Sequence, residues 1–205
     1  CHVDLETEDP VAYWQGVREE QRRVIAALEG HDMVMVRGPG CDLKLSIKGR
    51  KFVNGWGEHN MPDGEIYTGP IESSVAGWVR FTYPAVRQGR EVEGVELKFD
   101  GGRVVEAKAA KNQDYLLEML DLDEGSRWVG EFAFGTNFGI QRFTRNLLFD
   151  EKIGGTMHMA LGAGYPETGS KNESALHWDM ICDLRREAEI AVDGEIMYRD
   201  GKFLI

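Results

Sequence analysis

Short apolar runs separated by glycine constrain this fold more than any other feature of the sequence. The runs at residues 33–38, 42–47 and 50–55 alternate or are rich in β-branched residues, and each is bounded by glycine or proline. That pattern is typical of β-strands. The 25 glycines are dispersed along the chain as turn punctuation. We therefore expect many short strands joined by tight turns, with the first three runs arranged as a meander.

The same pattern continues through the rest of the chain. Further strands are expected within residues 72–83, 92–109 and 127–135, and in the last residues of the sequence. Tight hairpin turns need residues that tolerate a positive φ, and Asp-Gly pairs supply them. Three such turns are expected, at Asp100-Gly101-Gly102, Asp193-Gly194 and Asp200-Gly201.

Two helices are predicted. Residues 10–29 place an apolar stripe along one face, with Pro10 at the start and Gly30 just past the end. The stripe consists of Val11, Trp14, Val17, Gln21, Val24, Ile25 and Leu28. A shorter helix over 112–121 opens at Asn112. The fold class is therefore α+β: one β-rich domain over residues 1–205, with residues 1–30 as a leading segment and helix.

The composition is that of a globular protein with an acidic surface. With 205 residues, 42% of them hydrophobic and 29% charged, the chain can bury a substantial core. The formal net charge of −11 argues against nucleic acid or an anionic membrane as partner, because both need a basic patch. The arginine clusters at 18–23 and 185–186 are interleaved with glutamate, which is typical of solvated faces.

Cysteine usage favours a reducing compartment. Cys1, Cys41 and Cys182 are far apart in the sequence and form no CxxC pair. This is neither a disulfide framework nor a thiolate zinc site, so a cytoplasmic location is expected. The sequence shows no signal peptide and no apolar run of membrane-spanning length. Because the chain starts at Cys1 and not at methionine, we expect that an upstream segment is missing.

The candidate functional residues are two histidines and four acids. His177 and Asp179 project from one face if their segment is a strand, since side chains alternate with period two. The alternative is a core histidine bonded to a neighbouring acid, and His2 and His31 are expected to be solvated. Imidazole and carboxylate ligands suit one or two zinc, cobalt, manganese or iron ions. The six candidates are Glu65, Glu131, Glu151, His158, His177 and Asp179.

Each acid has an alternative interpretation when taken alone. Glu131 interrupts an otherwise apolar strand and can simply face solvent, and Glu65 can be a strand-edge acid after a Pro-Asp-Gly turn. Glycines at 154, 155, 162 and 164 surround His158. They allow either a close approach of the backbone to a ligand or a sharp bend.

Four segments taken together resemble one family. The segments are NMPDGEIYTGP, GEFAFGTN, LFDEKIGGTMHMALGAGYP and HWD; they lie within residues 60–179, and the resemblance as a whole covers about residues 20–185. In this order they resemble the aminopeptidase T, aminopeptidase S and aminopeptidase II family of dinuclear metallo-aminopeptidases. The resemblance implies that all six candidates are metal ligands, that Glu131 is shared by both ions, and that Tyr165 is a catalytic partner close to the metals.

The resemblance covers only part of the family's architecture. Family members have an N-terminal α/β domain followed by the domain that holds these residues, and they pair as dimers. This chain resembles the second domain alone, so it is expected to be a piece of a longer protein or a reduced natural form, and a homodimer. The spacing from Glu151 to His158 is longer than in other members, and the segment from Tyr165 to His177 is shorter.

The activity implied is removal of N-terminal residues from peptides. Two divalent ions, zinc, cobalt or manganese, would polarise the scissile carbonyl and activate a water molecule. Tyr165 is expected to donate to the developing oxyanion. Glu131 is the first candidate for the general base, followed by His59 and Glu72. No organic cofactor is expected.

Two other functions stay open at this point. One is a mononuclear iron dioxygenase of the 2,5-dihydroxypyridine ring-cleaving type, built on two histidines and one carboxylate. The resemblance implies that those enzymes have histidine at the position of Glu131. The glutamate in this chain therefore favours the hydrolase. The other is a metal-binding or dimerising domain that is inactive without an N-terminal half.

Overall fold

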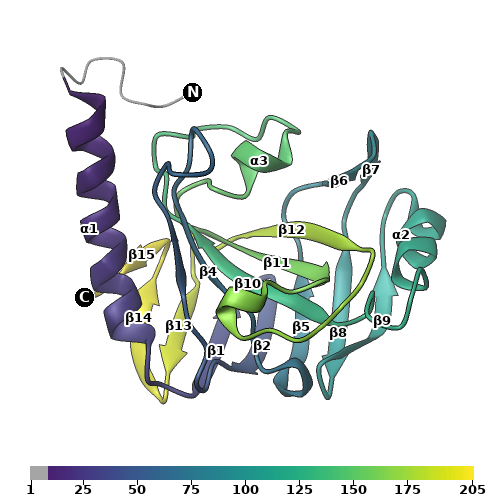
Figure 1. Ribbon diagram of the computed structural model, residues 1–205. Coiled ribbons are helices and arrows are strands. Elements are labelled where there is room, and N and C mark those ends of the chain that lie inside the picture. Colours follow the sequence, from purple (N-terminus) through teal and green to yellow (C-terminus); the bar gives the residue numbers. More distant parts are fainter. Residues whose placement is uncertain (1–8) are drawn as a thin grey trace.

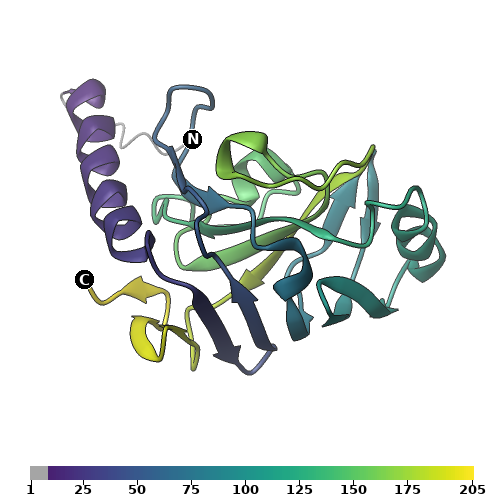
Figure 2. The ribbon, with the colours of Figure 1, turned by 60° about the horizontal axis from the view of Figure 1, so that its bottom comes forward.

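Two antiparallel sheets form the body of the molecule. The computed structural model describes residues 9–205, so Cys1 and His2 lie outside the described part. The larger sheet has eight strands in the order β15-β14-β13-β1-β2-β5-β8-β9. The smaller sheet has five, in the order β12-β11-β10-β4-β3, and β6 and β7 form a separate pair (Figures 1 and 2).

The strands are short, as the sequence predicts. The larger sheet comprises β1 (Met33–Gly38), β2 (Cys41–Ser46), β5 (Ala76–Arg80), β8 (Glu96–Asp100), β9 (Arg103–Lys108), β13 (Glu189–Val192), β14 (Glu195–Arg199) and β15 (Lys202–Phe203). The smaller comprises β3 (Val53–Gly55), β4 (Glu65–Thr68), β10 (Val129–Gly135), β11 (Thr156–Gly162) and β12 (His177–Asp183). The separate pair is β6 (Ala85–Arg87) and β7 (Arg90–Val92).

The leading helix is α1 (Pro10–Leu28), and it lies beside the edge of the smaller sheet at β3 and β4. Asp9 caps its first turn, because the carboxylate accepts hydrogen bonds from the backbone N–H groups of Val11 and Ala12. The predicted stripe is buried at Trp14, Gln21 and Leu28. Val11 departs from the prediction, with 66% of its surface exposed. The second helix, α2 (Gln113–Leu120), packs beside β9 at the other end of the molecule (Figure 1).

The predicted hairpins are confirmed. The Asp100-Gly101-Gly102 turn joins β8 to β9, with φ of 55° at Gly101 and 87° at Gly102. Asp193-Gly194 joins β13 to β14, and Asp200-Gly201 joins β14 to β15. In both of these turns each residue of the pair has a positive φ, as a two-residue hairpin loop requires.

Two local predictions need correction, and one element was not predicted. The first three runs do not form a meander, because β1 pairs with β2 while β3 joins β4 in the smaller sheet. The segment 72–83 begins as a 3₁₀ turn (Glu72–Ser74) before β5. The one-turn helix α3 (Leu147–Asp150) was not expected, because its apolar letters Leu-Leu-Phe are as compatible with a strand.

Side-chain alternation divides the smaller sheet into an apolar and a polar face. Phe132, Met159 and Trp178 belong to a core cluster that also draws on residues of the larger sheet, such as Val36 and Leu43. Their neighbours along the strands point the other way. The smaller sheet thus packs its apolar face into the core and leaves the opposite face for polar side chains, with Trp178 on the core side as expected.

Two further findings concern the cysteines and the helices. Among the described residues, Cys41 and Cys182 are free thiols, both buried. None of the helices within residues 9–205 combines the length and apolar character needed to cross a membrane.

Candidate metal centre

All six predicted ligands lie together on the polar face of the smaller sheet. Four strands supply five of them: Glu65 begins β4, Glu131 is in β10, His158 is in β11, and His177 and Asp179 are in β12. Glu151 follows α3 directly. Three overlapping groups have ligand atoms within 4.8 Å of one another. They are Glu65 with Glu131 and His158; Glu131 with His177 and Asp179; and Glu151 with His158 and Asp179.

Strand register explains how residues far apart in sequence meet. Glu131 of β10 and Asp179 of β12 both pair with Ala160 of β11, so the two acids flank a small side chain. His158 is flanked by Ala133 on β10 in the same way. Because alanine fills little space, the long acids and the imidazole can lean over it toward one another. The alanines therefore separate the ionisable residues across the strands and leave the space in which their side chains cluster.

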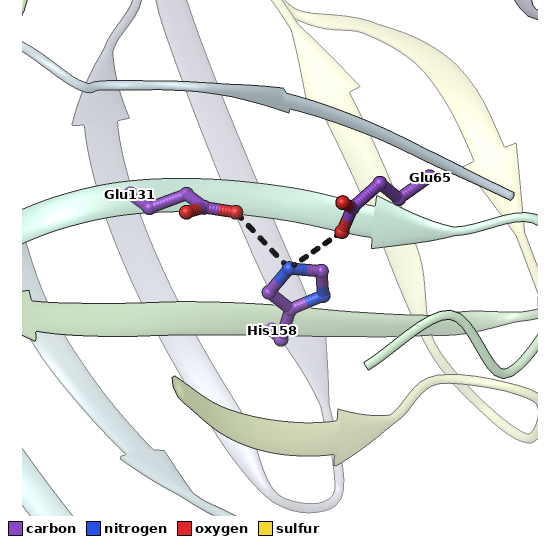
Figure 3. Close-up of side chains that lie close together, drawn as sticks. All are labelled: Glu65, Glu131 and His158. Atoms are coloured by element: carbon purple, nitrogen blue, oxygen red, sulfur yellow. Dashed lines mark hydrogen bonds and ion pairs between the residues drawn. The ribbon is translucent and has the colours of Figure 1, made fainter. Parts of the chain in front are cut away.

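His158 is at the centre of the first group. Its side chain is completely buried, and its Nε2 lies 3.1 Å from Glu131 Oε1 and 3.3 Å from Glu65 Oε2 (Figure 3). Burial opposes protonation of the ring, but the hydrogen bonds with Glu131 and Glu65 raise the pKa of His158 well above its usual value. Without metal, a proton on Nε2 balances the two carboxylates. That atom is also the one that would bind a cation.

Glu131 connects the first group to the second. Its Oε1 faces His158, while its Oε2 lies 3.5 Å from His177 Nε2. Only 3% of Glu131 is exposed, and burial raises the pKa of its carboxyl. The solvent-facing alternative is therefore wrong. One carboxylate thus contacts an imidazole of each group.

A backbone hydrogen bond fixes the orientation of the His177 ring. Its Nδ1 lies 2.8 Å from the carbonyl oxygen of Ala163, so Nδ1–H donates to the backbone and Nε2 is left to face the cluster. Histidines that bind metals commonly hold their other ring nitrogen in this way. Nε2 lies 3.5 Å from Asp179 Oδ2, and the charges of Asp179 and Glu131 raise the pKa of His177 against the effect of burial.

Tyr165 lies at the edge of the cluster. Its hydroxyl is 3.5 Å from His177 Nε2, and the two rings meet edge-on with centroids 5.1 Å apart. Burial and the nearby charges of Glu131 and Asp179 raise the pKa of Tyr165, so the phenol keeps its proton at neutral pH. Tyr165 can therefore donate a hydrogen bond toward the space in front of the cluster.

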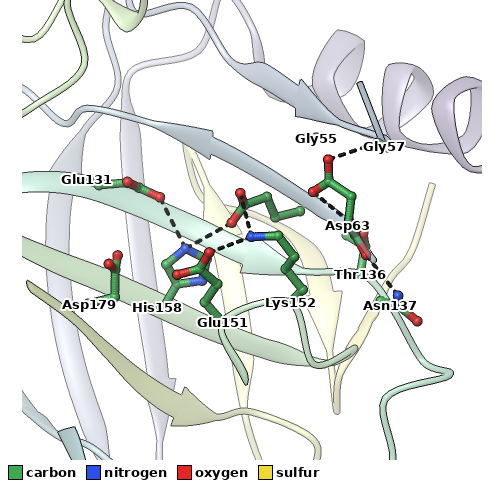
Figure 4. Close-up of polar contacts among 12 residues, drawn as sticks. Gly55, Gly57, Asp63, Glu131, Thr136, Asn137, Glu151, Lys152, His158 and Asp179 are labelled. Carbon is green, nitrogen blue, oxygen red and sulfur yellow. Dashed lines mark hydrogen bonds and ion pairs between the residues drawn. The ribbon is translucent and has the colours of Figure 1, made fainter. Parts of the chain in front are cut away.

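Lys152 is the important residue that sequence reasoning missed. Its side chain is completely buried, its Nζ lies 3.1 Å from Glu65 Oε1, and it also donates to Glu151 Oε1 (Figure 4). A lysine directly after an acid normally indicates a solvated charge pair. The signal that could have found it is its position between two candidate ligands, Glu151 and His158, in a run that is otherwise apolar and glycine-rich.

The weaker candidates for the general base have different surroundings. Glu72 does not line the cavity described below: its carboxylate pairs with Arg50, 2.6 Å away, and accepts the backbone N–H of Lys171. Its engagement with these structural partners removes it from the candidates. His59 is exposed and lines the cavity. Glu131 has both oxygens directed at imidazoles, which suits a ligand better than a base.

Gly162 and Gly164, near His158, let neighbouring segments of the chain pack closely. A Cβ on Gly162 would lie 2.1 Å from the carbonyl oxygen of Leu176, and one on Gly164 would lie 1.9 Å from Ser170 Oγ. Close approach is thus made by neighbouring protein segments, which hold the Tyr165 loop against the sheet. This close packing against neighbouring segments is not among the two roles expected from the sequence, which are close approach to a ligand and a sharp bend.

A cavity of about 190 Å³ opens above the cluster. Its lining includes Glu65, Glu131, Glu151 and Asp179, together with apolar or aromatic walls at Val53, Tyr67, Leu148 and Tyr165. The donor set fits divalent cations, because carboxylate oxygens crowd around two imidazoles. Fold and site together define a β-rich domain with a candidate cation centre made of nitrogen and oxygen ligands.

The chain belongs to the thermophilic metalloprotease (M29) family, whose model matches residues 2–203. This confirms the resemblance drawn from the four sequence segments. Aminopeptidase T of Thermus thermophilus is 30% identical over 95% of this chain and 52% of its own length. Aminopeptidase AmpS of Bacillus subtilis is 36% identical over 70% of this chain and 38% of its own.

Solved structures show the same fold. Wild-type AmpT from Thermus thermophilus superposes with a TM-score of 0.84 at 26% identity, over 96% of this chain and 56% of that one. A 2,5-dihydroxypyridine dioxygenase from Pseudomonas putida gives a TM-score of 0.69 at 18% identity, over 97% of this chain and 63% of that one. The second likeness shows the fold alone. The chain spans about half the length of the aminopeptidases T that it matches.

Proposed function

We propose that residues 1–205 are the metal-binding catalytic domain of a metallo-aminopeptidase, which removes N-terminal residues from peptides at a site holding two divalent ions. Membership of a metalloprotease family and relatives named aminopeptidases support the class of reaction. The observation that carries the proposal is the position of Glu131, whose two carboxylate oxygens face His158 and His177.

In this proposal Glu131 joins two half-sites. Glu65 and His158 complete one of them, and His177 and Asp179 complete the other. When bound, a pair of divalent ions polarises a carbonyl and lowers the pKa of a water molecule toward neutrality. Zinc, cobalt and manganese all accept these nitrogen and oxygen ligands, so each is a candidate.

The cavity suits the amino end of a peptide. A free α-amine is cationic at neutral pH, and the lining carries five carboxylates, since Asp63 joins Glu65, Glu131, Glu151 and Asp179. The apolar and aromatic walls at Val53, Tyr67 and Leu148 can contact the first side chain of the substrate. Tyr165, which keeps its proton, is placed to donate to the oxyanion that develops at the scissile carbonyl.

The dioxygenase alternative needs a different balance of ligands. Ring-cleaving iron enzymes of the facial-triad type use two histidines and one carboxylate, with open positions for oxygen. Here four carboxylates surround the two imidazoles, which suits two ions better than one. A homodimer and a cytoplasmic location stay predictions from the sequence.

The test is metal analysis of the purified chain coupled to turnover of leucyl-p-nitroanilide. Samples are loaded separately with zinc, cobalt and manganese after treatment with a chelator. We expect about two ions per chain and release of nitroaniline. One tightly held iron with oxygen uptake would overturn the hydrolase in favour of the dioxygenase. Two ions without turnover would show that the domain binds metal but is inactive alone.

A further inference from the structure

Lys152 places a permanent positive charge inside the candidate metal centre. Its Nζ is 3.1 Å from Glu65 Oε1 and donates to Glu151 Oε1, and its side chain is completely buried. Glu65 is thereby divided between two partners, because its other oxygen lies 3.3 Å from His158 Nε2. The ammonium thus contacts one carboxylate oxygen on each of two predicted ligands, and Figure 4 shows it beside Glu151.

The backbone holds Lys152 in this position. Its carbonyl oxygen accepts the backbone N–H of Asn137 at 3.0 Å, and Gly154 donates back to the carbonyl oxygen of Asn137 at 2.9 Å. Just before it, the fully buried Asp150 accepts two hydrogen bonds from Thr144. The turn that carries Lys152 is therefore anchored on both sides, and the side chain enters the cluster from a fixed point.

The charges of the cluster are unbalanced without this lysine. Four carboxylates, Glu65, Glu131, Glu151 and Asp179, lie around two imidazoles. Over residues 9–205, the only ammonium or guanidinium that forms an ion pair with any of these four is that of Lys152. Burying a charge without a partner costs several kcal/mol, so an internal cation stabilises the folded chain when no metal is bound.

We propose that Lys152 is a built-in counter-cation that competes with a divalent ion for Glu65 and Glu151, and so sets the metal affinity of the site. This inference rests on the proposed metal centre. A divalent ion needs the oxygens that the ammonium holds, and a positive charge a few ångströms away repels it. Lys152 thus lowers the affinity of the site for metal and raises the stability of the metal-free protein.

The test compares three variants with the wild type. Lys152→Met keeps the length of the side chain and removes the charge, whereas Lys152→Arg keeps the charge. Lys108→Met removes the same formal charge from an exposed position on β9 and is the matched control. Manganese affinity is measured by calorimetry on chelator-treated protein, and thermal unfolding is followed with and without manganese.

We expect Lys152→Met to bind manganese at least about tenfold more tightly than the wild type, because repulsion and competition are both removed. Its metal-free form should unfold at a lower temperature, and manganese should restore most of the loss. Lys152→Arg and Lys108→Met should bind manganese as the wild type does. Equal or weaker binding by Lys152→Met, with the same loss of thermal stability in both conditions, would overturn the proposal and leave Lys152 a packing residue.

Two further outcomes are decisive. If Lys152→Met folds only in manganese, the competition is supported, because metal then replaces the missing charge. If it folds in neither condition, Lys152→Gln takes its place, because glutamine keeps a hydrogen-bond donor without the charge. The same measurements and criteria then decide whether the proposal holds. No peptide enters these measurements, so an absence of turnover affects the proposed function alone. Failure of both wild type and variants to bind manganese would overturn the metal centre as well.

Discussion

At Glu131, one buried carboxylate faces two imidazoles, with Oε1 3.1 Å from His158 and Oε2 3.5 Å from His177. Its cross-strand partner Ala160 is small, which leaves room for the acid to reach both imidazoles. Sequence reasoning could select these residues by type, because histidines are rare and an acid in an apolar strand is unusual. It missed Lys152, because a lysine directly after an acid usually indicates a solvated charge pair, and only its position between two candidate ligands indicated otherwise.

Tyr165 offers a test of catalysis that is separate from metal binding. Tyr165→Phe should lower kcat for leucyl-p-nitroanilide about a hundredfold or more, as removal of an oxyanion donor does elsewhere. Metal content and the unfolding midpoint should stay unchanged, because 37% of Tyr165 is exposed and its hydroxyl makes only a long contact. Tyr13→Phe, on α1, is the control. A kcat equal to that of the wild type would remove Tyr165 from the reaction.

The ionisable cluster predicts how pH affects the metal-free protein. Burial and the charge of Asp179 raise the pKa of Glu151 from 4.5 to about 7, so its contribution to stability is complete below pH 4.5 and is lost as pH rises to about 7. The raised pKa values of His158 and His177 act in the same direction, with contributions complete below pH 6.5. Glu65 opposes them: burial raises its pKa, but hydrogen bonding with His158 outweighs this and lowers it to about 2, so its contribution is lost only in acid.

Urea unfolding in the presence of a chelator checks this prediction. The metal-free protein should be most stable in mild acid and should lose stability as the pH rises from about 4.5 through about 7. Metal should reverse the trend over that interval, because the ligands must be deprotonated to bind it. A metal-free protein that is equally stable across the interval would show that the cluster does not govern stability.

At the scale of the elements, the sequence predicts strands and turns well but their pairing poorly. Alternation and Asp-Gly pairs are local signals, and they place β1, the β8–β9 hairpin and the C-terminal hairpins correctly. The division into two sheets depends on contacts between distant segments, such as β4 with β10, which no local pattern encodes. The packing of α1 onto β3 and β4 can be anticipated in part from the sequence, because a polar Gln21 in an apolar stripe needs a buried partner. In the structure, Gln21 donates a hydrogen bond to the backbone carbonyl of Glu65.

Gly162 tests how strand geometry supports the site. It ends β11 opposite His177 with φ of 98°, and a Cβ there would lie 2.1 Å from the carbonyl oxygen of Leu176. Gly162→Ala should therefore lower the free energy of unfolding by about 1–3 kcal/mol and weaken metal binding through His177. Gly16→Ala is the control, since this helical glycine has open space around it and should gain about 0.5–1 kcal/mol. Equal unfolding free energies for the two variants would contradict the packing argument.

At the scale of the whole molecule, the chain is a β-rich unit with one core cluster and an acidic cavity on the outer face of its smaller sheet. The chain covers 52% and 53% of the length of the two aminopeptidases T that it resembles, and the homodimer stays a prediction. The net charge of −11 includes the cluster acids, and bound cations would offset part of it. The family could be identified from the sequence because the four segments keep their order. The burial of Lys152 could be established only from the folded structure.

The most direct measurement is the metal content of Glu131→Gln, compared with the wild type and with Glu173→Gln, a change at an exposed glutamate. The amide keeps the size of the side chain but cannot serve as a charged ligand to two ions. We predict about two ions per chain in the wild type and in Glu173→Gln, and fewer than about one in Glu131→Gln, with hydrolysis lost in parallel. Two ions retained by Glu131→Gln would contradict the shared-ligand account.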